Sequence, residues 1–163
     1  MRKDEHQGGC EMDMIWKSEY EIGLAESDVQ HRYFLDLLRR LQEHENSDLH
    51  DREARMLLRE IDRYAYYHFS SEELLMSIYR YPDLHQRKHK HFNLLQVLDK
   101  KICDFRQLGT KVGPLCKFLT RWFFRHIDDD DREMARYIRR SRETDQSIDP
   151  RHMTASISRD LRL

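Results

Sequence analysis

The sequence predicts an all-α protein: an up-down-up-down antiparallel four-helix bundle with an N-terminal arm and a C-terminal tail. Of its 163 residues, 39% are hydrophobic and 36% are charged, a balance that suits amphipathic helices. Only five Gly and three Pro are present, too few for the many turns of a sandwich or barrel of short strands. Apolar residues recur at helical spacing in four segments with short connections, which implies antiparallel neighbours.

The first helix is expected over residues 28–45, with Ser27 or Asp28 as its N-terminal cap. Its apolar residues follow one another at the spacing of one helical face, Phe34, Leu35, Leu38 and Leu41. Before it, residues 1–26 show no sustained period, so we expect an extended arm that lies over the bundle. Two apolar residues are its expected anchors, Trp16 and Ile22.

Three further helices are expected over residues 50–79, 82–107 and 114–127. The third and the fourth each begin at a proline, which the first turn of a helix tolerates. Gly109 and Gly113 are expected to break the chain between them. The spacing of apolar residues therefore accounts for all four helices of the bundle.

The chain after the fourth helix is polar. A short amphipathic segment at residues 134–138 is expected to add a turn or two, and no fixed structure is assigned to the tail beyond it. We therefore divide the chain into an arm (1–26), a bundle (27–140) and a polar tail or linker (141–163).

Charge and cysteine usage exclude several classes of protein. The formal net charge is −1 with both signs interleaved, which argues against a nucleic-acid partner. Neither a signal peptide nor a membrane span is recognisable, so we expect a cytoplasmic protein without membrane insertion. The cysteines lack CxxC spacing, which argues against a disulfide framework or a zinc site. Whether Cys103 and Cys116 form a redox pair across a helical hairpin is left open.

Several of the 10 histidines are expected on buried helix faces. In an up-down-up-down bundle, the start of the first helix, the end of the second, the start of the third and the end of the fourth meet at one end. Polar groups on the apolar stripes there would be costly without partners. The side chains at these places that we expect to converge on the bundle axis are His31, His68, Glu72, His85, His89 and His126.

The remaining histidines fail the same test. His91 follows His89 by two residues, about 200° around a helix, and is expected to face solvent. His44 should lie on the far side of its helix, and His50 is about 27 Å along the axis from His68. The tail histidines, His6 and His152, are expected outside the site.

Asp131 needs a special condition to join this group. Five residues after His126, it would be rotated about 140° on an ideal helix. It can reach the axis only if the fourth helix ends there or widens into a π-type turn. The alternative is that the run of aspartates at 128–131 is simply solvated.

The number of these groups favours a pair of iron ions. Five imidazoles and two carboxylates exceed what one tetrahedral zinc can use. Two octahedral ions offer about twelve positions, and this set with one bridging oxygen fills about eleven, which leaves one for a small ligand. Ferritin-like sites use Glu-x-x-His pairs, which the candidate helices lack.

Four segments, DVQH (28–31), HFSSEELLM (68–76), HQRKHKHF (85–92) and LTRWFFRHIDDDD (119–131), resemble the bacterial hemerythrins. The resemblance covers roughly residues 16–138. It implies two iron ions (Fe2+/Fe3+) joined by an oxo or hydroxo bridge, with Glu73 beside the site but not a ligand. The implied ligands are His85, His89 and His126 on one iron, His31 and His68 on the other, and Glu72 and Asp131 between them.

The resemblance also implies a function, reversible O2 binding for carriage, storage or delivery, with no enzymatic role. The alternative is an O2- or redox-sensing module that acts on an output domain or protein partner through the C-terminal segment. Either role needs a pocket that excludes water. Its candidate lining residues, each of a type that is more often plain bundle core, are Leu35, Phe69, Leu75, Met76 and Trp122.

Overall fold

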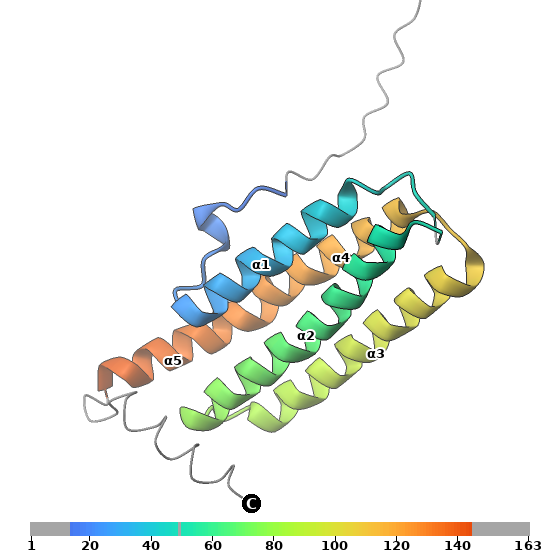
Figure 1. Cartoon of the computed structure of the whole chain (residues 1–163). Helices are drawn as coiled ribbons and strands as arrows, with labels where there is room; N and C mark the ends of the chain where they lie inside the picture. Colours follow the sequence, from blue (N-terminus) through green and yellow to red (C-terminus); the bar gives the residue numbers. More distant parts are fainter. Residues whose placement is uncertain (1–13, 49, 145–163) are drawn as a thin grey trace, which may run out of the picture.

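The computed structural model describes residues 14–48 and 50–144, and in this part of the chain all regular structure is helical. The elements are η1 (Ser18–Tyr20), α1 (Ala25–Gln42), α2 (Arg52–Ile78), α3 (Leu84–Leu108), α4 (Val112–His126), η2 (Ile127–Asp131) and α5 (Arg132–Thr144). Helices α1 and α3 each contact both α2 and α4. Figure 1 shows them as an antiparallel bundle, which confirms the predicted fold.

Helix α1 begins at Ala25, three residues earlier than expected, and Asp28 is not its N-terminal cap. Asp28 lies inside the first turn, and its carboxylate accepts hydrogen bonds from the main-chain N–H groups of Ile22 (2.8 Å) and Gly23 (3.1 Å). Gly23 has a φ of +79°, a left-handed conformation that glycine adopts without strain. Asp28 is therefore part of the helix, and its side chain connects the arm to it.

The connections follow ordinary helix-end chemistry. The Asp51 carboxylate accepts from the main-chain N–H groups of Glu53 and Ala54 and so caps α2. Helix α3 ends at Gly109, which has a φ of +62°, as the sequence indicates. Gly113 does not break the chain, because α4 already begins at Val112.

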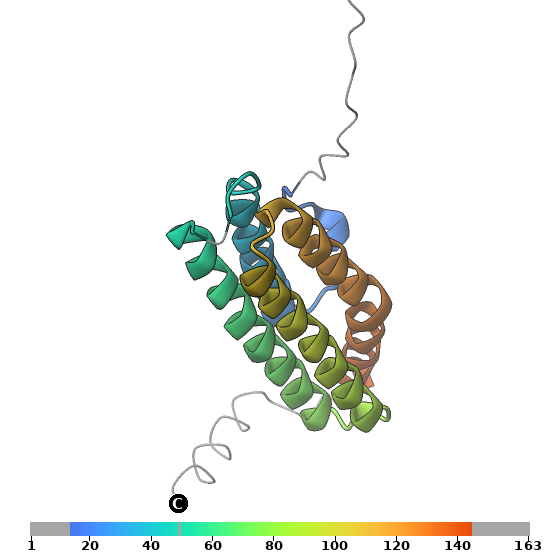
Figure 2. The ribbon, with the colours of Figure 1, turned by 90° about the vertical axis from the view of Figure 1, so that its right-hand side faces the viewer.

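Helix α4 does not stop near Ile127 as expected. It passes through the π-helical turn η2 directly into α5, so the segment after Asp131 is a helix of 13 residues and not a turn or two. Figure 2 shows the whole run as one continuous helix. Three apolar residues of α5 are buried, Met134, Ala135 and Ile138. The tail predicted at 141–163 lies outside the described residues from residue 145 onward.

The arm and the core behave as the apolar pattern indicates. Ile22 is buried and Trp16 packs partly buried against the core, so both anchor the arm. The predicted stripe of α1 is buried throughout. Cys103 is exposed and Cys116 is buried, and both are free thiols. None of the described helices has the length and apolar character needed to cross a membrane.

Candidate metal centre

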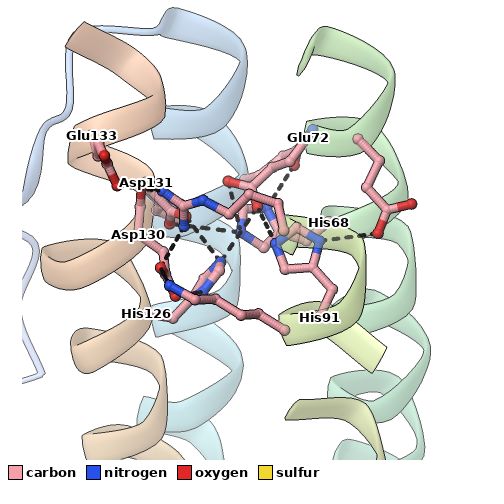
Figure 3. Close-up of polar contacts among 12 residues, drawn as sticks. His68, Glu72, His91, His126, Asp130, Asp131 and Glu133 are labelled. Atoms are coloured by element: carbon pink, nitrogen blue, oxygen red, sulfur yellow. Dashed lines mark hydrogen bonds and ion pairs between the residues drawn. The ribbon is translucent and has the colours of Figure 1, made fainter. Parts of the chain in front are cut away.

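Five of the seven predicted ligand residues meet at one end of the bundle. His31 comes from α1, His68 and Glu72 from α2, His126 from the end of α4 and Asp131 from η2. All five residues are at most 4% exposed. Figure 3 shows the labelled members turned toward one another between the helices. The antiparallel order of the helices brings them to one depth, as the sequence indicates.

The other two predicted ligands, His85 and His89, lie on the exposed surface of α3, and His91 takes their place in the cluster. His91 is 2% exposed, so the expectation that it faces solvent is wrong. The prediction fails because Phe92, an apolar residue three positions after His89, is 59% exposed and does not mark the buried face of α3. The true stripe is Arg87, His91, Leu95, Leu98, Ile102 and Phe105. Stepping back from Ile102 by three or four residues would have found His91.

Asp131 reaches the cluster because the helix widens at η2. The main-chain N–H of Arg132 donates to the carbonyl of Ile127, five residues earlier, where a regular α-helix would reach back four. The longer turn brings Asp131 onto the face of His126, and their Nε2 and Oδ1 atoms lie 2.9 Å apart. The π-type turn, one of the two alternatives open from the sequence, is therefore present.

The first of two metal-binding positions, called position 1, is formed by His31 and His68. The Nε2 atom of His31 lies 3.2 Å from Oδ2 of Asp131. The Nε2 atom of His68 lies 3.6 Å from Oε1 of Glu72 and 4.0 Å from Oδ2 of Asp131. Ligand atoms of these four residues all lie within 4.8 Å of one another, close enough to share one ion.

Position 2 is formed by His91 and His126. The Nε2 atom of His91 lies 3.4 Å from Oε2 of Glu72. The Nε2 atom of His126 lies 3.3 Å from the same oxygen and 2.9 Å from Oδ1 of Asp131. Glu72 and Asp131 therefore each turn one oxygen toward position 1 and the other toward position 2, the arrangement of two carboxylates that bridge a pair of ions.

Hydrogen bonds on the far side of the rings hold two of the imidazoles in this orientation. Nδ1 of His68 lies 2.9 Å from Oε1 of Gln30, whose amide in turn donates to Ser71. Nδ1 of His91 lies 3.0 Å from Oε1 of Glu73, so Glu73 supports a candidate ligand, in keeping with the expected role beside the site. When Nδ1 carries the proton in this way, the Nε2 lone pair is left for a metal.

The apo cluster is poorly satisfied, which tests whether a metal fits. Among the described residues, several of its buried atoms have no well-formed hydrogen bond: both ring nitrogens of His31, Nε2 of His68, Oε1 of Glu72 and Oδ2 of Asp131. Buried polar groups without partners are costly, and most native structures avoid them. Four of these atoms, one from each of the four residues, face one another at position 1, so a cation that takes nitrogen and oxygen ligands fits there. At position 2, ligand atoms of Glu72, His91 and His126 also lie close enough to share one ion.

The pKa values of two of the imidazoles point the same way, whereas the pKa of His126 is raised well above its usual value because Asp131, Asp130 and Glu72 outweigh its burial, so a metal would displace a proton there. Burial and the neighbouring His31 hold the pKa of His68 well below its usual value, and burial together with His126 lowers that of His91 to about 3. Burial and the nearby Asp131 raise the pKa of Glu72 to about 8. Neutral imidazoles are the form that binds metal, and a bound cation would offset the crowding of the two acids.

Aromatic rings close the cluster toward the core. Phe69 stacks on His91 with ring centroids 4.3 Å apart and meets His126 edge-on at 4.8 Å. Trp122 contacts Phe69 at 5.8 Å. The other residues expected to line a ligand pocket differ in burial: Leu35 and Met76 are buried and Leu75 is half-buried. Their contact with a ligand stays a prediction.

Curated relatives of this chain are bacteriohemerythrins. The protein of that name from Stenotrophomonas maltophilia is 28% identical over 130 residues, which cover 77% of this chain and 82% of the relative. The one from Pseudomonas aeruginosa is 27% identical over 134 residues, with 78% and 83% covered. The one from Clostridium acetobutylicum is 26% identical over 126 residues, with 73% and 96% covered.

The fold and the family agree with these relatives. A crystal structure of a leucine-to-phenylalanine mutant superposes with a TM-score of 0.68 at 23% identity, and the match covers 76% of this chain and 95% of that one. The sequence profile of the family described as "Hemerythrin HHE cation binding domain" matches residues 23–138. The resemblance found in the sequence is thereby confirmed, and the chain belongs to the hemerythrin HHE cation-binding family.

Proposed function

We propose that this chain holds two iron ions, one at position 1 and one at position 2, and binds O2 reversibly at that pair. The observation that carries the proposal is the division of each carboxylate of Glu72 and Asp131 between the two imidazole pairs. One ion would leave one imidazole pair and two carboxylate oxygens unused. Two ions use every donor in the cluster.

The donor set favours iron for this role. Each position offers two imidazole nitrogens and two carboxylate oxygens, a mixture that suits both ferrous and ferric ions. Bound iron supplies the reversible electron transfer that O2 binding requires, and an oxo or hydroxo bridge between the ions belongs to the same proposal. Membership of a cation-binding family supports a metal at this site.

The protein's own residues do the rest. Gln30 and Glu73 fix two imidazoles by their hydrogen bonds, so the ligands are set before the metal arrives. Phe69 and Trp122 exclude water from the side of the core, which protects a reduced centre from irreversible oxidation. Carriage, storage or delivery of O2 is the role that this arrangement supports best.

A sensing role has one specific observation in its favour. The ligand Asp131 is the last residue of η2, and Arg132 begins α5 directly after it. A change in the position of Asp131 would therefore be carried along α5 toward the C-terminal segment, where an output domain or protein partner could respond. Removing the chain after Thr144 tests this role: an unchanged O2 affinity and an unchanged set of bound partners would rule it out.

The main experiment combines iron content with visible spectra. The protein is loaded with ferrous iron without air, and the spectrum is taken before O2, with O2 and after O2 is removed. We expect two iron ions per chain and an absorption band that appears with O2 and disappears without it. The control is the double variant His31→Ala/His126→Ala, which removes one imidazole from each position. A chain that keeps no iron, or whose band does not reverse, would contradict the proposal.

A further inference from the structure

Helix α3 contributes one ligand to the cluster where α2 contributes two. On α2, His68 and Glu72 are four residues apart and therefore share a face. On α3, the residue four before His91 on the same buried face is Arg87, which is only 4% exposed. Arg87 thus stands where a second α3 ligand, aimed at position 2, would stand.

Arg87 cannot itself bind a metal. Its guanidinium stays protonated and has no lone pair to donate. Its position is nevertheless fixed from several sides, since Nη1 lies 2.5 Å from Oδ1 of Asp130 and Nη2 lies 3.3 Å from Oε2 of Glu133. Nη2 also donates to the main-chain carbonyl of Asp130. Arg87 is therefore built into the site and not a loose surface side chain.

These contacts lie on the turn that aims a candidate ligand. Asp130 is part of η2, immediately before Asp131, and its Oδ2 lies 3.6 Å from Nδ1 of His126. Lys90 adds a second cation to Asp130, at 3.0 Å. The guanidinium therefore links α3 to the π-helical turn. It does so beside Asp131 and His126, two of the candidate ligands of position 2.

With Arg87 in this place, the two positions have matching protein ligands. Each receives two imidazoles and one oxygen from each of Glu72 and Asp131. A bridging oxygen would bring each ion to about five of its six octahedral ligands. A fifth imidazole would instead complete one ion and leave only the other open.

We propose that Arg87 holds the place of a third imidazole at position 2 and so leaves an open coordination position on each of the two ions. It acts as a positioning residue that fixes the π-helical turn without supplying a ligand. A small ligand can then reach either ion of the pair, not just one. This inference rests on the proposed function, because it assumes that both positions hold a metal.

The test adds the missing nitrogen donor. The variant Arg87→His is titrated with Co2+, whose visible spectrum reports its ligands, and each step of binding is measured by competition with a chelator. We expect both proteins to bind two Co2+ per chain. Compared with Arg87→Leu, which lacks the same guanidinium, one step in Arg87→His tightens by at least about tenfold, as expected for an added ligand, and the spectrum of that ion changes while that of the other ion stays the same.

Two control variants separate a new ligand from a general disturbance. Gln86→His places an imidazole on the exposed neighbour of Arg87 and should change neither step. Arg87→Leu removes the guanidinium without adding a donor and should weaken binding, because the turn that aims Asp131 loses its anchor. If Arg87→His does not fold, Arg87→His/Asp130→Asn removes the carboxylate that would be left with less charge compensation and serves for the same titration.

The outcomes distinguish the inference from the function beneath it. If the wild-type chain binds fewer than two Co2+, the proposed function fails and the inference fails with it. If the wild type binds two and both steps and both spectra of Arg87→His match those of Arg87→Leu, the function stands and Arg87 does not hold the place of a ligand. A tightened step with a changed spectrum supports both.

Discussion

The two ends of the bundle use the same helices for opposite purposes. At one end, the inward positions carry the candidate ligands from all four bundle helices, together with Asp131 of η2. Farther along the same helices, those positions are apolar and fully buried, as at Leu41, Ala54 and Leu98. The apolar end stabilises the fold by itself, whereas the polar end buries imidazoles and acids that need a cation. The same helical period thus places both core residues and ligands at inward positions, and the type of residue there decides whether the position serves packing or metal binding.

The largest effect should come from removing the metal. Chelation of the loaded protein should lower the free energy of unfolding by about 4 kcal/mol for each of the two ions, at a free metal concentration about 1,000 times its dissociation constant. The loss falls on the polar end, where buried atoms of the cluster again lack partners. Chemical denaturation with and without chelator measures it.

The matched control carries His31→Ala and His126→Ala together. Both side chains are almost fully buried, and each belongs to a different position. With an imidazole missing from each position, chelator should not change the stability of this variant. An equal loss of stability in the wild type and the variant would mean that the metal stabilises some other part of the chain.

A core truncation at the apolar end should have the next largest effect. Leu38 is completely buried, and Leu38→Ala should reduce the free energy of unfolding by about 3 kcal/mol through lost burial and a cavity. The number of metal ions per chain at low temperature should stay the same. If the variant lost metal while keeping its stability, packing at the apolar end and metal binding at the polar end would not be independent.

The fold and most of the candidate ligands could be predicted from the sequence. Where the prediction placed a residue on the wrong face, the reason lies in the apolar pattern of that helix. His31, His68 and Glu72 were found because their helices carry long apolar stripes that fix the phase. Helix α3 carries more polar residues near its start, so exposed Phe92 was enough to shift the predicted phase by two residues and to exchange His89 for His91.

Two features lie beyond what helical spacing can decide. Whether the helix widens at η2 depends on interactions from other helices, including the bond from Arg87 to the carbonyl of Asp130. Asp28 likewise bonds main-chain groups of the arm, and its place inside α1 follows from that contact more than from its propensity to cap. A contact between distant segments influences the first, and a hydrogen bond to the arm six residues away sets the second; the apolar pattern encodes neither.

A helix cap far from the metal should have a smaller effect. Asp51→Ala removes the cap of α2 and should cost about 1 kcal/mol at pH 7. A hydrogen bond from Ser47 and those of the cap lower the pKa of Asp51, so its contribution is present above the unfolded pKa and is lost as pH falls through the lower folded value. Denaturation curves at several pH values should show the wild-type advantage shrinking below about pH 4. A difference that does not depend on pH would contradict the role of the carboxylate.

The smallest effect should come from a histidine that the sequence placed in the site. His89 is exposed, so His89→Ala should change stability by less than about 0.5 kcal/mol and leave both ions bound. His91→Ala, two residues along, should lose the ion at position 2. Metal analysis of this pair of variants sharpens the contrast between the exposed and the buried face of α3, and metal loss from the His89 variant would reverse the assignment.

The most direct test is a crystal structure of the iron-loaded protein with anomalous scattering measured at the iron absorption edge. We expect two peaks: one between His31 and His68, the other between His91 and His126, with Glu72 and Asp131 touching both. A single peak, or a peak beside His85 and His89, would contradict the account.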